Sequence, residues 1–266
     1  MNEQQPYFYF GPDIQILPSL KKDTMLDVNT DIKTKVLLLI GTIETSKKPP
    51  DCFWTYSGDF DSQGMSFGPL QWNFGQTTFQ SLLLKMITSF PKIFVDCFGA
   101  SADILKEILV KSSDEQMKWV RSIQTKNKIN PDWALKFTLL GKTLEFQNIM
   151  VQDANFKYFA RAKGMMSVYG LKSERGFALL SDICVQSGNI KDSTRDKILS
   201  SYKNDTNEID KMKLISTYRS QDCNPKWQSD VLNRKMTIAT GKGVIHQIHF
   251  DLEKDYFITM KDAIFS

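Results

Sequence analysis

The sequence predicts a mostly helical protein in which a small antiparallel sheet follows the first helix. Two observations predict this fold class. Apolar residues recur at helical spacing over much of the chain from position 31 to about position 239. One segment, residues 53–73, departs from that spacing and is rich in aromatic residues, Gly, Ser and Asp, which is typical of a short hairpin or small sheet.

Length and composition limit the function classes. A chain of 266 residues with 41% hydrophobic and 24% charged residues can bury the core of one large or two-lobed globular domain. The net charge of +4 suits an anionic polymer, although enzymes with neutral substrates carry as much. No cluster of Lys and Arg is dense enough to predict binding to nucleic acid.

Residues 1–29 are predicted to form an irregular N-terminal arm, because Pro6, Pro12 and Pro18 interrupt any helix. The arm lacks the basic start and continuous apolar core of a Sec-type signal peptide. The longest nearly apolar run, Val36 to Ile43, is too short to cross a bilayer. We therefore expect no membrane span.

The first helix is predicted to begin after Thr30 or Asp31 and to be buried on most sides. Glu44 lies near its end, before two lysines and two prolines stop it. After the sheet of 53–73, a helix is expected over 76–90, ended by Pro91. Further helices are predicted over 102–112, 113–126, 132–148, 152–169, 173–188, 194–203, 207–219 and 226–239, and a hairpin or loop over 241–258.

Three carboxylates are the candidate catalytic groups. Cleavage of a sugar bond commonly uses one carboxyl group that protonates the leaving oxygen and one that activates water. Glu44 follows an apolar helix, and a carboxyl against such a surface stays protonated more easily. Asp59 and Asp61 flank Phe60 in a glycine-bounded turn, where two alternate side chains can line one wall of a cleft. We favour Asp59 over Asp61 as the base.

Other polar and aromatic residues are weaker candidates. Ser66 and Gln71 stand in an otherwise apolar run and need partners, either a sugar hydroxyl or a backbone group. Trp72 could stack on a sugar, although a single aromatic residue more often belongs to a core. His246 and His249 have no obvious third ligand, so no metal site is expected. The four widely spaced cysteines (Cys52, Cys97, Cys184 and Cys223) are more simply buried thiols than disulfides.

Glu44, the turn from Gly58 to Gly64 and the segment Ser-Phe-Gly-Pro-Leu-Gln at 66–71 resemble the lysozyme-like superfamily, including goose-type lysozymes, lytic transglycosylases and bacterial chitosanases. The longer motif from Gly58 to Gln76 resembles a group of bacterial and phage cell-wall hydrolases. The resemblance covers residues 36–85. It implies a two-lobed catalytic domain over 30–266, with the small β lobe at about 53–73 and the helical lobe at about 90–240.

Two later segments are similar to the same families. Residues 182–188 resemble the chitosanase segment in which an Asp and a Gln flank the cleft, and residues 234–243 resemble a late helix and loop of the cell-wall hydrolases. The resemblance therefore implies substrate contacts by Asp182, Gln186 and Arg234, beside Ser66, Gln71 and Trp72.

The activity that the resemblance implies is hydrolysis of β-1,4 bonds in peptidoglycan, with Glu44 as acid, Asp59 or Asp61 positioning water, and no metal or cofactor. The chain would be an antibacterial effector or phage lysin, made in the cytoplasm and delivered to the cell wall by a dedicated route. Its partners would be peptidoglycan strands and an immunity protein or secretion-system carrier. Three alternatives stay open, namely a chitosanase, a lytic transglycosylase that needs only Glu44, and a glycan-binding module without activity.

Overall fold

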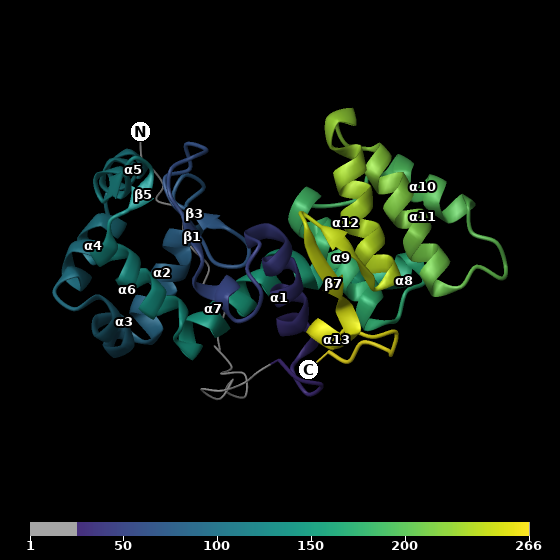
Figure 1. Ribbon diagram of the computed structural model, residues 1–266, viewed down its shortest axis with the longest axis horizontal. Helices are drawn as coiled ribbons and strands as arrows, with labels where there is room; N and C mark the ends of the chain where they lie inside the picture. Colours follow the sequence, from purple (N-terminus) through teal and green to yellow (C-terminus); the bar gives the residue numbers. More distant parts are fainter. Residues whose placement is uncertain (1–25, 266) are drawn as a thin grey trace, which may run out of the picture.

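A central helix, α1 (Ile32–Thr45), separates the two lobes of the fold (Figure 1). The computed structural model describes residues 26–265, so residues 1–25 of the predicted arm lie outside the described residues. Asp31 caps α1, because its carboxylate accepts hydrogen bonds from the backbone nitrogens of Lys33 and Thr34. Every residue of α1 from Val36 to Ile43 is buried. The prediction of a central buried helix that ends beside Glu44 is confirmed.

The predicted small sheet follows α1 and the 3₁₀ turn η1 (Asp51–Trp54). Its strands β1 (Tyr56–Ser57), β2 (Ser66–Phe67) and β3 (Trp72–Asn73) pair in antiparallel order β1-β2-β3. The sheet packs close to α1, because a Cβ atom on Gly41 would lie 2.7 Å from Cβ of Pro69 in the turn between β2 and β3. Because glycine has no side chain, the turn can pack directly against α1 at position 41, about one helical turn before Glu44.

The first lobe packs helices around a cluster of phenylalanines. Phe67 of β2 stacks on Phe79 at a ring-centroid distance of 4.8 Å, and both rings contact Phe137 and Phe146. The elements of this lobe are α2 (Thr78–Ser89), α3 (Pro91–Phe98), α4 (Ser101–Leu109), α5 (Ser113–Ser122), β4 (Gln124–Thr125), β5 (Lys128–Ile129), α6 (Pro131–Gly141) and α7 (Leu144–Ala154).

The second lobe is built on α9, which packs against α8 and α12 (Figure 1). Its elements are the π-helical turn η2 (Asn155–Phe159), α8 (Ala160–Tyr169), α9 (Glu174–Ser187), α10 (Asp192–Ser200), α11 (Glu208–Gln221), η3 (Pro225–Trp227), α12 (Gln228–Thr240), β6 (Lys242–Ile245), β7 (Ile248–Asp251) and α13 (Leu252–Tyr256). The hairpin expected within 241–258 is confirmed as β6–β7.

Some predicted helices have different bounds. The helix expected over 132–148 is two helices, because Thr143 caps α7 by accepting a hydrogen bond from the backbone nitrogen of Phe146. The helix expected over 113–126 ends at Ser122, and a β4–β5 hairpin follows, turning at Lys126 and Asn127 with φ of 52° and 58°. Pro91 begins α3 instead of only ending α2.

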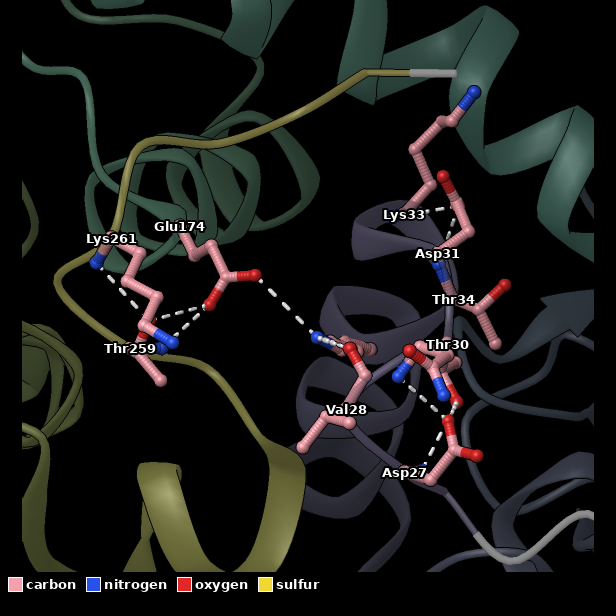
Figure 2. Close-up of polar contacts among 11 residues, drawn as sticks. Asp27, Val28, Thr30, Asp31, Lys33, Thr34, Glu174, Thr259 and Lys261 are labelled. Carbon is pink, nitrogen blue, oxygen red and sulfur yellow. Dashed lines mark hydrogen bonds and ion pairs between the residues drawn. The ribbon is translucent and has the colours of Figure 1, made fainter.

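The C-terminal segment, residues 259–263, ties α1 to α9 (Figure 2). Glu174 at the start of α9 accepts hydrogen bonds from the backbone nitrogen and hydroxyl of Thr259, while Lys35 of α1 lies 3.4 Å from its other carboxylate oxygen. Backbone hydrogen bonds from Glu174 to Lys261 and from Ala263 to Lys172 extend the contact. None of the helices within residues 26–265 has the length and apolar character that a bilayer crossing requires.

Candidate active site

Glu44 meets an arginine from the opposite end of the sequence. Its side chain is 30% exposed at the C-terminal end of α1, and its Oε1 atom lies 2.6 Å from Nη2 of Arg234 on α12. The apolar residues of α1 face the core, whereas the Glu44 carboxylate contacts a guanidinium. The expectation that the Glu44 carboxyl group lies against an apolar surface is therefore wrong. A fixed guanidinium instead orients it.

Arg234 belongs to a buried charge cluster that also contains Asp182 and Lys235. The Asp182 carboxylate on α9 is completely buried and accepts hydrogen bonds from Nε and Nη2 of Arg234 at 2.8 and 2.5 Å. Its second oxygen accepts a hydrogen bond from Nζ of Lys235. Lys235 also donates to Oε1 of Gln186 at 2.7 Å. The buried set holds one carboxylate and two cations, and the partly exposed Glu44 supplies a second carboxylate at its edge.

The ionisation of the cluster follows from burial and pairing. Burial acts to raise the pKa of Asp182, but the charges of Arg234 and Lys235 outweigh it and hold that pKa below its usual value. Burial lowers the pKa of Lys235 to about 8, because the attraction of Asp182 only partly offsets the loss of water. Burial acts to lower the pKa of Arg234, but Asp182 and Glu44 raise it above its usual value. Arg234 is therefore a permanent cation facing Glu44.

The two aspartates of the turn between β1 and β2 have different surroundings. The Asp59 side chain is 12% exposed, and its carboxylate accepts hydrogen bonds from Nε of Arg121 at 2.7 Å and from the backbone nitrogen of Gly64 at 2.8 Å. Burial acts to raise the pKa of Asp59, but these two hydrogen bonds outweigh it and lower that pKa. Asp61 is exposed, and its carboxylate accepts a hydrogen bond from the backbone nitrogen of Gln63 at 3.1 Å.

The other candidates on the sheet are largely engaged by the protein itself. Ser66 is buried in β2. Gln71, with φ of 52°, donates from its side chain to the carbonyl of Gly68 at 2.9 Å. Trp72 is buried, and its Nε1 donates to Asp153 at 2.8 Å. Their predicted role as substrate contacts stays a prediction, and protein contacts account for Nε2 of Gln71 and Nε1 of Trp72.

The structure brings together Glu44, Asp182, Gln186 and Arg234, which the sequence proposed separately, and adds Lys235. A signal for Lys235 was present, because it shares the helical phase of Val231 and Ile238, so burial could have been expected. Among residues 26–265 no grouping of His, Cys, Asp and Glu could hold a metal ion. The four cysteines are free thiols.

Scans of protein-family models and of curated protein sequences found no match to this chain. Solved structures do match. A family 46 chitosanase from Gynuella sunshinyii in complex with chitotetraose gives a TM-score of 0.56 at 12% identity, covering 84% of this chain and 98% of the other. A mutant chitosanase from Bacillus subtilis in complex with six GlcN gives a TM-score of 0.55 at 14% identity, and the match covers 85% of this chain and 98% of the other. A further chitosanase complex gives a TM-score of 0.55 at 12% identity, and the match covers 85% of this chain and 99% of the other.

At such low identity the similarity establishes the fold. The chain has the mostly helical, two-lobed lysozyme-like fold of these chitosanases, with small antiparallel sheets, and the predicted fold class is confirmed. The structural neighbours belong to the lysozyme-like superfamily that the motifs resemble. Activity and substrate have to be argued from the side chains.

Proposed function

We propose that this protein is a glycoside hydrolase that cleaves β-1,4 bonds in a polymer of glucosamine, as a chitosanase does. The observation that carries the proposal is the contact between Glu44 and Arg234, which joins the end of the central helix to the second lobe. The fold adds support, because the chitosanases with chitotetraose and GlcN cover 84–85% of this chain.

Glu44 is the general acid in this proposal. Nη2 of Arg234 contacts Oε1 of Glu44. The other oxygen, Oε2, is therefore the one that transfers the proton to the glycosidic oxygen in this proposal. Because Asp182 fixes the guanidinium, Glu44 keeps one orientation while the leaving oxygen approaches. Arg234 and Asp182 are positioning residues in this mechanism, and neither needs to contact the glycan.

Asp61 is the base that we propose, in place of the initially favoured Asp59. Each carboxylate oxygen of Asp59 accepts a hydrogen bond, one from Arg121 and one from Gly64, so its side chain is fixed within the turn and its charge is paired. Asp61 is exposed and forms no ion pair within residues 26–265. A water between Asp61 and the sugar requires carboxyl groups about 6.5–9.5 Å apart and gives inversion at the anomeric carbon.

The charges near the site favour a cationic glycan. Arg234 and Lys235 are buried and paired with Asp182, and Arg121 is paired with Asp59. The exposed carboxylate of Asp61 is left without a counter-charge in the described part of the chain, and it would attract the ammonium groups of a glucosamine polymer. Peptidoglycan is the second candidate, because the motif from Gly58 to Gln76 resembles cell-wall hydrolases.

The test compares chitohexaose with purified peptidoglycan in water enriched in heavy oxygen, using the wild type, Glu44→Gln and the control Glu107→Gln. Glu107 is an exposed residue of α4. We expect chitohexaose fragments labelled at their reducing ends, and a loss of about 10²–10⁴-fold in rate for Glu44→Gln alone. Labelled fragments from peptidoglycan only would favour a muramidase, and unlabelled anhydro-sugar ends a lytic transglycosylase. Binding without cleavage by the wild type would leave a glycan-binding module.

A further inference from the structure

Phe60 lies between the two aspartates of the turn and has an unusual environment for a phenylalanine in this protein. Its side chain is 69% exposed, whereas the rings of Phe53, Phe67 and Phe74 nearby are buried. It forms no contact with another aromatic ring of residues 26–265, although most phenylalanines of the first lobe do. Nothing in the described core needs a ring at position 60.

The turn that carries Phe60 is firmly held. The backbone nitrogen of Asp59 donates to Oε1 of Gln124 at 2.9 Å, and Nε2 of Gln124 donates to the carbonyl of Gly64 at 2.8 Å. Gly58 lies so close to the β4–β5 hairpin that a Cβ atom there would be 1.9 Å from the carbonyl oxygen of Asn127. The ring of Phe60 is therefore exposed on a braced support, and little conformational freedom is lost when a ligand binds it.

The chemistry beside Phe60 matches an amino sugar. One face of a pyranose ring carries C–H groups that pack on an aromatic ring, and a nearby ammonium group is attracted to the ring face. The next residue, Asp61, offers a carboxylate without an ion pair in the described part of the chain. A glucosamine unit held by Asp61 is therefore one residue along the chain from an exposed apolar ring.

We propose that Phe60 is a substrate-binding residue that stacks on a glucosamine ring beside the cleavage point, an inference that rests on the proposed function. Phe60 contributes binding and orientation, while the bond is broken between Glu44 and Asp61. Its loss weakens binding of the glycan more than it slows the chemical step. A tryptophan at position 60 preserves the stacking, whereas an alanine removes it.

The experiment measures binding of chitohexaose by calorimetry in the Glu44→Gln background, which cannot consume the ligand. Phe60→Ala is expected to weaken binding about tenfold, and Phe60→Trp to retain it. Phe156→Ala is the matched control, because Phe156 is 83% exposed on the π-helical turn η2, away from the aspartates in sequence, and this variant should bind as its parent does. In the active protein, Phe60→Ala should raise KM by a similar factor with kcat nearly unchanged.

Three results decide the matter. Unchanged binding and KM in Phe60→Ala, in a protein that cleaves chitohexaose, would overturn the role of Phe60 and leave the proposed function standing. A similar loss in Phe156→Ala would also overturn it, because the effect would then come from general apolar exposure. Neither binding nor cleavage of chitohexaose by the unmodified protein would overturn both the proposed function and this inference. Thermal melting should be the same for every variant, since both rings are exposed.

Discussion

Arg234 bridges two carboxylates, because its Nη2 atom lies 2.6 Å from Oε1 of Glu44 and donates to Oδ1 of the fully buried Asp182, which also accepts from Nε. Lysine lacks a second donor such as Nε, so it would lose the paired contact with Asp182 that fixes the direction of the group facing Glu44. We therefore expect Arg234→Lys to lower kcat on chitohexaose by about 100-fold through misplacement of Glu44.

The control for this variant is Arg195→Lys. Arg195 bridges Asp192 and Asp196 on the exposed surface of α10, so the same exchange of side chains there should leave kcat unchanged. Equal rates in wild type and Arg234→Lys, measured at saturating substrate, would contradict the positioning role of Arg234.

Asp182 should matter for stability as much as for activity. Asp182→Asn leaves the buried cations Arg234 and Lys235 with too little negative charge, and we expect a loss of about 3–5 kcal/mol in the free energy of unfolding. Urea titration followed by circular dichroism measures this loss. A change below about 1 kcal/mol would mean that the charges are solvated. The double variant Asp182→Leu with Lys235→Met should recover part of the stability without recovering activity.

The two aspartates of the turn should separate into a catalytic and a structural residue. Asp61→Asn is expected to lower kcat by about 10²–10⁴-fold with an unchanged melting temperature, because Asp61 is exposed. Asp59→Asn is expected to lower the melting temperature, because it weakens the contact with Arg121. The opposite pattern, with kcat lost in Asp59→Asn at full stability, would restore Asp59 as the base.

The stability that Asp59 provides should depend on pH. Its pKa in the folded protein is lowered, so the folded state binds the proton less readily than the unfolded state, where an Asp has a pKa of about 3.9. The contribution is then fully present above about pH 5 and is lost as the pH falls through the folded-state pKa. The difference in unfolding free energy between wild type and Asp59→Asn should therefore be largest near pH 6 and should shrink toward pH 2. A difference that is independent of pH would contradict this origin.

Local patterns predicted the elements around the site. The apolar run from Val36 to Ile43 and the cap at Asp31 predicted α1, and the Gly- and aromatic-rich segment predicted the sheet of β1–β3. The helix bounds that were predicted wrongly depend on residues that fit either the end or the start of a helix. Pro91 can end one helix or begin the next, and the cap at Thr143 interrupts an apolar spacing that continues on both sides.

The candidate site was harder to predict, because its contacts join distant parts of the chain. Resemblance to known families pointed to Asp182 and Arg234 as substrate contacts, but spacing along the sequence could not show that they pair with each other and with Glu44. Arg121 and Gln124 were missed altogether. They belong to a segment without a recognisable motif, and their role depends on a hairpin that docks against the turn of Asp59.

The tie between α1, α9 and residues 259–263 also has a consequence for synthesis of the protein. Glu44 leaves the ribosome early, but Arg234 emerges 190 residues later, and Glu174 gains Thr259 as a partner 25 residues after that. The nascent chain therefore carries Glu44 without its partner until Arg234 has been made, and α1 and α9 without their common tie until residues 259–263 follow. The first lobe can therefore fold during synthesis before the carboxylate that it carries has met its arginine partner.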